Sequence, residues 1–177
     1  NMPSGLDESI AQSEVNWYVD SASPANVYCV YEGERHYRPR WDLPDGQREI
    51  HYAEDDPRES FSGTISGIDC NGLLKYRNGD YFNGTISNDQ LMSGHGKITT
   101  EYGTYEGDFF NGEMNGPNAY FSYPNGDVFV GSFANNEFKE GKYTVKQTGE
   151  YFVGSFKKGQ PSKGTWYDKK GNKLETL

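Results

Sequence analysis

Few residues in this sequence have the types and spacing that chemistry requires. Its three histidines and two cysteines stand at His36, His51, His95, Cys29 and Cys70, without the short intervals at which zinc ligands recur. Two cysteines are also too few for a disulfide scaffold. We expect them to be buried thiols, and a bridge between them stays open. The sequence therefore predicts no metal site.

The carboxylates do not form an acid/base pair either. Asp55, Asp56 and Glu59 cluster around Pro57 and are interpreted as the charge of a linker. The sequence contains no Gly-x-Ser-x-Gly elbow, phosphate-binding loop or dinucleotide glycine pattern. A glycosylation sequon at residues 83–85 lies in a predicted strand and is discounted. We therefore predict that the chain is not an enzyme and binds no cofactor.

The composition indicates β-structure. Glycine accounts for 22 of the 177 residues, tyrosine for 14 and phenylalanine for 10. Abundant glycine and aromatic residues with few aliphatic ones favour antiparallel strands joined by tight turns over a helical bundle. No apolar run reaches the about 18 residues that a membrane-spanning helix needs.

The charge is unevenly distributed along a chain whose net charge is −9. Residues 1–57 contain 12 acidic residues and no lysine, whereas residues 139–177 contain nine lysines and four acidic residues. Nucleic acid is disfavoured as a partner, because binding a polyanion requires clustered basic residues. Membrane lipid is disfavoured by the same net charge. The exception is the lysine-rich C-terminal end, for which we expect contact with an anionic surface or, as the alternative, a solvated charged rim. Its lysines are Lys157, Lys158, Lys163, Lys169, Lys170 and Lys173.

The strongest pattern is an internal repeat. An aromatic residue, a glycine two positions later and an apolar residue two positions further on recur five times. The central glycines, 21 to 24 residues apart, are Gly63, Gly84, Gly107, Gly131 and Gly154. A second element follows each copy, at 72–74, 96–98, 118–120, 141–143 and 164–166, and a turn sequence such as Asn125-Gly126-Asp127 follows that. Such a period predicts a repeat architecture.

Each repeat has the pattern of a β-hairpin. Alternate residues of a strand share a face, so the rings should line one face of a sheet and the polar residues the other. Asn111-Gly112 suits a two-residue hairpin turn, whereas residues 87–92 are interpreted as a longer, irregular loop. The central glycines are expected to be structural and to leave room for a neighbouring ring. The predicted aromatic face contains Phe82, Tyr105, Phe109, Phe129, Phe133, Tyr143, Phe152, Phe156 and Trp166, with Ile98 and Tyr120 joining it.

The pattern resembles the membrane occupation and recognition nexus (MORN) repeat. The best match is residues 103–116, Gly-Thr-Tyr-Glu-Gly-Asp-Phe-Phe-Asn-Gly-Glu-Met-Asn-Gly, and the resemblance covers about residues 58–172. The third repeat departs from it, with Gly116-Pro117-Asn118 in place of Gly-x-Gly. The resemblance implies an all-β fold, an elongated, twisted, single-layer antiparallel sheet of consecutive hairpins. It also implies a scaffold for protein binding, localisation or dimerisation, and the family name adds lipid binding.

Residues 1–57 lack the repeat. We expect an acidic, non-repeat segment that packs on or caps the array of residues 58–177; a partner-binding arm is the alternative. Within it, a strand is expected at 27–31, a hairpin of 37–41 with 48–52 around a turn at 43–46, and a linker at 53–57. A short helix is expected to begin at Asp7.

A single-layer sheet cannot bury both of its faces, so something must cover the aromatic face. We expect a non-catalytic scaffold that binds a protein partner, or itself as a homodimer, through that face or a sheet edge. The nine rings above are the candidate protein-binding residues, and packing within the array is their alternative role. A membrane-surface module acting through the lysine-rich end and a carbohydrate-binding repeat stay open. Free thiols and the absence of a visible leader favour the cytoplasm, and a signal peptide removed upstream stays open.

Overall fold

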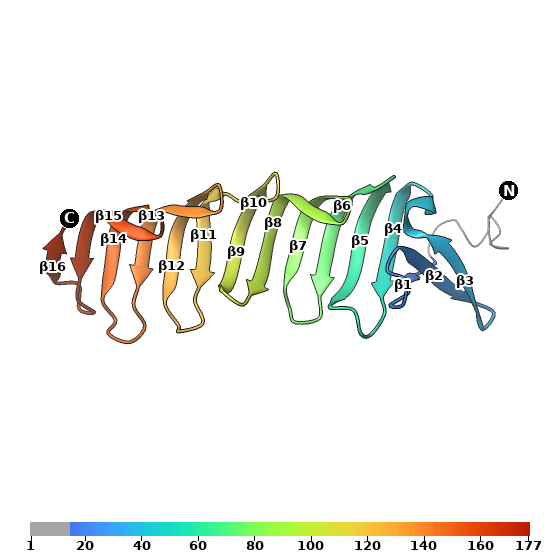
Figure 1. Ribbon diagram of the computed structural model, residues 1–177, viewed down its shortest axis with the longest axis horizontal. Helices are drawn as coiled ribbons and strands as arrows, with labels where there is room; N and C mark the ends of the chain where they lie inside the picture. The colour runs from blue at the N-terminus through green and yellow to red at the C-terminus, as the bar shows by residue number, and fades with distance from the viewer. Residues whose placement is uncertain (1–14) are drawn as a thin grey trace. The chain divides into compact units, whose positions relative to one another are not determined.

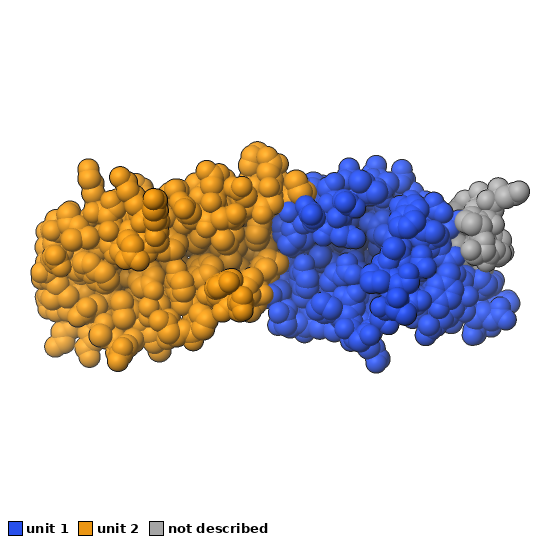
Figure 2. All heavy atoms as spheres, in the orientation of Figure 1, with its two compact units in different colours: residues 1–91 blue, residues 92–177 orange. Residues whose placement is uncertain are grey.

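A computed structural model describes residues 15–177, and these residues form an all-β protein (Figure 1). Within residues 15–177, sixteen strands and one short 3₁₀ helix follow each other, and no α-helix occurs. The helix expected at Asp7 lies outside them. The chain divides into two compact units, residues 1–91 and 92–177 (Figure 2). In each unit, strands that are consecutive in sequence pair as hairpins of an open antiparallel sheet, which confirms the predicted fold class.

Unit 1 joins the N-terminal segment to the first repeat and to the first strand of the second repeat. Its elements are β1 (Trp17–Val19), β2 (Asn26–Tyr31), β3 (Glu34–Pro39), η2 (Arg40–Asp42), β4 (Gly46–Tyr52), β5 (Arg58–Ser66), β6 (Asp69–Tyr76) and β7 (Tyr81–Ser87). The strand order is β3-β2-β1-β4-β5-β6-β7, antiparallel except that β1 runs parallel to β4. Because β4 pairs with β5, the segment caps the edge of the first repeat, as expected.

The hairpin predicted from residues 37–41 and 48–52 is wrong. Strand β3 pairs with β2 instead, through a tight turn in which Glu32 and Gly33 have φ of 52° and 80°. Positive φ at both central residues matches the right-handed twist of the strands. The residues between β3 and β4 form the 3₁₀ helix η2, and β4 pairs with β1. Trp17 and Val19 of β1 are buried, so β1 contributes to the core beside β4.

Unit 2 consists of hairpins only. Its strands are β8 (Gln90–Thr100), β9 (Gly103–Phe110), β10 (Glu113–Met114), β11 (Gly116–Ser122), β12 (Val128–Ala134), β13 (Glu137–Thr144), β14 (Tyr151–Lys157), β15 (Gln160–Tyr167) and β16 (Lys173–Thr176). They are antiparallel in the order β8-β9-β11-β12-β13-β14-β15-β16, and the short β10 pairs with β9.

The turns within the repeats follow the predicted chemistry with one exception. Asn111 and Gly112 have φ of 50° and 83°, as a two-residue turn requires. The irregular loop predicted at 87–92 is wrong, because β7 and β8 are separated only by Asn88 and Asp89. Their φ values of 50° and 62° form the same turn, since Asn and Asp tolerate the left-handed region. Other residues with positive φ at such turns are Asn135, Asn136, Lys158 and Gly159.

The strand glycines pair with one another across the sheet. Gly131 faces Gly141, which faces Gly154 on its other side. A Cβ atom on Gly131 would lie 2.7 Å from the Cα of Gly141 and 2.9 Å from a ring carbon of Phe129. The ring of Phe129 also lies against Gly141 on the neighbouring strand. A side chain on Gly131 or Gly141 would therefore meet the facing backbone, and the ring of Phe129 covers the space that the missing side chain leaves.

The rings of unit 2 share one face, as predicted. The ring centroid of Tyr105 lies 5.2 Å from that of Phe109 and 5.0 Å from that of Phe133. The ring centroid of Phe129 lies 5.6 Å from that of Phe133. The buried residues of this cluster are Tyr105, Ala119, Phe129, Phe133, Phe152 and Phe156.

The face predicted for Tyr120 is wrong. Its side chain is 43% exposed, while Ala119 is buried and Phe121 packs against the core cluster. Ala119 pairs with Gly131, as Gly141 does on the other side of that strand, and Phe121 pairs with Phe129, as Tyr143 does. Ala119 rather than Asn118 therefore takes the place of the return-strand glycine. A slip of one residue moves every side chain of a strand to the other face.

Candidate functional site

The candidate protein-binding rings lie mainly inside the units. The structure buries six of the nine, Phe82 in unit 1 and the following in unit 2: Tyr105, Phe129, Phe133, Phe152 and Phe156. Phe109, Tyr143 and Trp166 are partly buried and pack against the core cluster of unit 2. The structure therefore brings the eight rings of unit 2 together as a core, and a contact surface must be built from other residues.

Hydrogen bonds fix two phenols at the margin of this core. The hydroxyl of Tyr105 donates to the backbone oxygen of Asp108 at 2.6 Å, and that of Tyr143 donates to Oδ2 of Asp127 at 2.7 Å. Burial raises the pKa of Tyr105 to about 12. Burial and the bond to Asp127 raise the pKa of Tyr143, and the same bond lowers the pKa of the Asp127 carboxyl. Both tyrosine hydroxyls therefore stay protonated and donate hydrogen bonds that fix the surrounding structure.

The opposite face of unit 2 has an exposed apolar row. Tyr120 pairs with Val130, Val130 with Lys142, and Lys142 with Val153. Tyr120, Val130 and Val153 are 43%, 49% and 43% exposed, and the Lys142 Nζ atom lies 4.3 Å from the ring centroid of Tyr151. We call Tyr120, Val130, Lys142 and Val153 the outer row. Exposed apolar side chains gathered in one place mark an interaction surface more often than scattered ones do.

Sequence reasoning missed the outer row. Valine stands between the aromatic residue and the central glycine only in the fourth and fifth repeats, where earlier repeats have Ser62, Asn83 and Glu106. That exchange of a polar for an apolar residue at a solvent-facing position was the available signal. Tyr120 was assigned to the wrong face, so its place beside Val130 was also hidden.

Charged residues flank the outer row in a defined order. Glu106 on β9 pairs with Tyr120 on β11, and Lys142 lies beyond Val130 on β13. Four neighbouring strands thus present an acid, two apolar residues and a base. A shallow groove beside Val153 extends the surface between residues 140 and 163.

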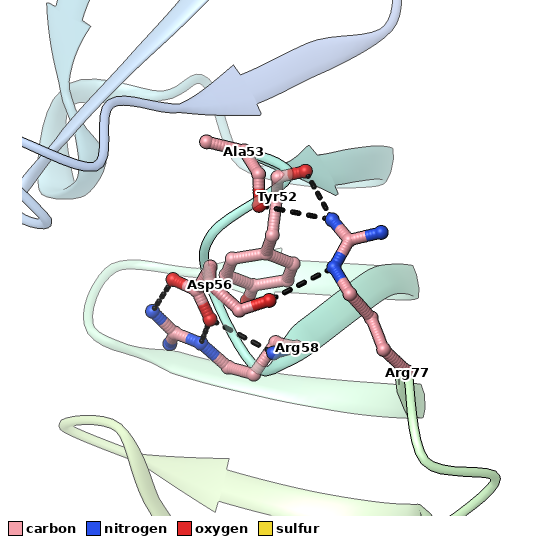
Figure 3. A network of polar contacts seen from close by, with 5 residues as sticks. All are labelled: Tyr52, Ala53, Asp56, Arg58 and Arg77. Carbon is pink, nitrogen blue, oxygen red and sulfur yellow. Dashed lines mark hydrogen bonds and ion pairs between the residues drawn. The ribbon is translucent and has the colours of Figure 1, made fainter.

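In unit 1, a polar network fixes the segment expected to be a linker (Figure 3). Arg77 donates through Nη2 to the backbone oxygens of Tyr52 and Ala53, at 2.8 and 2.9 Å, and through Nε to that of Asp56 at 2.8 Å. Arg58 donates to both carboxylate oxygens of Asp56 at 3.1 and 2.9 Å, and its guanidinium lies 4.1 Å from the Tyr52 ring centroid. Burial raises the pKa of Asp56, but its bonds to Arg58 and the two arginine charges outweigh it, so the pKa is lowered. Asp56 is therefore half of a structural ion pair.

The C-terminal lysines do not form one patch. Lys157 and Lys158 lie at the turn that leads into β15, whereas Lys169 and Lys170 lie in the turn that follows β15. The eight residues of β15 separate the two turns, which is about 26 Å at 3.3 Å per residue. Their charge is thus divided between opposite ends of the strands.

The histidines and cysteines have simple surroundings. The His95 Nδ1 atom lies 2.8 Å from Oδ1 of Asp108. Cys29 and Cys70 are free thiols, one buried and one partly buried, and burial raises the pKa of both. Within residues 15–177, no three potential metal ligands cluster. The described part of the chain also contains no helix that is long and apolar enough to cross a membrane.

Comparison with known proteins returns no relative: no family model matches the sequence, and a search of curated proteins finds no significant similarity.

Proposed function

We propose that this chain is a non-catalytic, MORN-type repeat scaffold that binds a protein surface through the outer row of unit 2, and that a second copy of the chain is one such partner. The observation that carries this proposal is the exposure of Tyr120, Val130 and Val153 in register on one face. The aromatic rings support the surface from behind, because their packing holds the strands that present it.

The order of charges favours self-association. A two-fold axis parallel to the strands, placed between β11 and β12, would lay Tyr120 of one copy on Val130 of the other. The same axis would bring Glu106 opposite Lys142 at both ends of the contact. Isologous dimers require such a self-complementary surface, and opposite charges at the rim fix its register. The outer row, together with Glu106 beside it, meets both conditions.

The expected affinity is modest. A standard stable interface buries about 800 Å² per partner, and three half-exposed apolar side chains with two charge pairs supply only part of that. We expect dimerisation at tens of micromolar chain concentration, and the strength is expected to fall as salt screens the charge pairs.

Sedimentation velocity of the full chain from about 1 to 200 µM tests the proposal. Val130→Lys should shift the chain to the monomer over this range. The matched control is Ser62→Lys, which alters the exposed position before the central glycine of the first repeat and should leave association unchanged. A wild-type chain that stays monomeric throughout, or a Val130→Lys variant that dimerises like the wild type, would contradict self-association through this face.

Carbohydrate binding is a second candidate, supported by a row of tyrosines in unit 1. The ring centroids of Tyr18 and Tyr28 lie 5.6 Å apart and those of Tyr28 and Tyr37 5.4 Å apart, and all three rings are partly exposed. His51 extends the row, 5.6 Å from Tyr18. Flat rings with polar tips can stack on sugars. Glycan-array binding that Tyr28→Ala abolishes would support this function, and no glycan signal above background would remove it.

A further inference from the structure

Unit 1 contains a small polar cavity beside an open cleft. The cavity has a volume of about 50 Å³, and the cleft has a volume of about 230 Å³. Arg40 and Asp89 line both, so the two spaces meet at these residues. The cavity is also lined by Arg58 and Tyr52, which belong to the network of Figure 3. The space is too polar for a dry void, and it exceeds the volume that one water molecule needs.

One donor of the Arg40 side chain lacks a hydrogen-bond acceptor, although Cys70 on the cavity wall is hydrogen-bonded to the guanidinium. Its Nη1 atom is buried and has no hydrogen-bond partner in the structure. An unsatisfied buried donor of a charged group costs more than a lost neutral hydrogen bond, so native proteins rarely leave one. Arg58 differs, because Asp56 accepts two of its hydrogen bonds. A bound acceptor would satisfy Nη1 of Arg40, for which the described residues offer none.

The cleft supplies an apolar wall next to that donor. Trp41 and Ile68 line it and are 56% and 57% exposed. Trp41 directly follows Arg40 in η2, so one rigid turn of chain presents a ring to the cleft and a guanidinium to the cavity. A pocket with apolar walls and a few convergent polar groups is the usual form of a small-molecule site.

We propose that the cavity and cleft bind a small organic anion. Its carboxylate or phosphate accepts hydrogen bonds from Nη1 of Arg40, and its apolar body lies against Trp41 and Ile68. The volume of the cleft limits that body to about one ring. The site is independent of the outer row, which lies in unit 2.

Asp89 gives the proposal a directional consequence. Its carboxylate lies on the same walls as Arg40 and repels an incoming anion. Removing that charge should therefore strengthen binding, whereas removing the charge of Arg40 should weaken it. A neutral ligand of the same shape responds to neither change, which separates charge recognition from simple apolar contact.

Ligand-observed NMR titration of the full chain tests the site with three probes: 3-phenylpropionate, phenyl phosphate and the neutral 3-phenylpropanol. We expect at least one anion to bind about tenfold or more tightly than the alcohol, as a charge-assisted hydrogen bond would produce. Arg40→Gln should remove that preference, and Asp89→Asn should tighten anion binding by about threefold. Arg35→Gln, an exposed arginine of β3, is the matched control and should bind like the wild type.

Preference for the carboxylate or for the phosphate identifies the anionic group, and either one supports the site. Equal binding of anion and alcohol overturns the proposal, as does the absence of binding up to about 10 mM or a loss of affinity in Asp89→Asn. Should Arg40→Gln fail to fold, the Asp89→Asn comparison decides alone, because it predicts a gain that a damaged structure does not produce.

Discussion

Replacing Phe129 with alanine separates core packing from surface contact for the aromatic rings. The side chain is fully buried, and its ring centroid lies 4.7 Å from that of Phe138, 5.4 Å from that of Phe156 and 5.6 Å from that of Phe133. Truncating a buried phenylalanine costs about 3–5 kcal/mol, part of it from the lost aromatic pairs at about 0.5–1.5 kcal/mol each. A domain has a total stability of about 5–15 kcal/mol, so this loss is a large fraction.

Urea unfolding followed by circular dichroism measures the loss. With a slope of about 1–3 kcal/mol per molar urea, the midpoint should fall by on the order of 2 M. Phe129→Leu, which keeps most of the apolar volume, should lose only about 1.5 kcal/mol and stay folded at room temperature. Phe110→Ala is the matched control, since that ring is 60% exposed and should change stability by less than about 0.5 kcal/mol.

An unchanged midpoint for Phe129→Ala, together with loss of self-association, would refute this reasoning. It would mean that the ring contacts a partner and that the aromatic face, rather than the outer row, is the binding surface.

Three further predictions concern the repeats and the network of unit 1. Gly131→Ala should lower the unfolding free energy by about 1–3 kcal/mol, because the new Cβ would meet the backbone of the facing strand; a gain in urea stability, the ordinary effect of removing a strand glycine, would contradict the close approach. Tyr143→Phe removes a hydrogen bond that lowers the pKa of Asp127 in the folded state. That bond stabilises the fold above the unfolded pKa of about 3.9, and its contribution is lost as pH falls through the lower folded pKa. The difference in unfolding free energy between wild type and variant should therefore narrow below about pH 4. A difference that does not change with pH would contradict the role of this bond. Arg77→Ala removes three hydrogen bonds to the loop before β5 and should speed amide hydrogen exchange there, whereas unchanged protection would show that the network does not fix the loop.

The hairpins could be predicted from the sequence because their signals are local. Ring spacing set the faces, and Asn-Gly pairs such as Asn111-Gly112 set the turns. Tyr120 was misplaced because Asn118 was aligned with the return-strand glycine, whereas Ala119 is the residue that faces Gly131. A slip of one residue reverses the faces of a strand. The pairing of β1 with β4 joins segments about 30 residues apart, which no local pattern reveals.

The sites were harder to predict than the fold. The outer row depends on which strands are neighbours, because Val130 and Val153 look like ordinary strand residues until Lys142 and Tyr120 are placed between and beside them. The cavity at Arg40 combines residues from a 3₁₀ turn, five strands and a hairpin turn. The sequence also did not show that most rings of the predicted aromatic face are buried. A sequence pattern indicates which residues share a face but not how tightly they pack.

Charge reversal across the outer row tests the central claim most directly. If two copies meet with Glu106 opposite Lys142, then Glu106→Lys and Lys142→Glu should each make the chain monomeric at about 100 µM in sedimentation equilibrium. The double variant should restore the dimer, because the exchanged charges again face each other. A double variant that is as monomeric as the single variants, or single variants that dimerise like the wild type, would contradict the proposed interface.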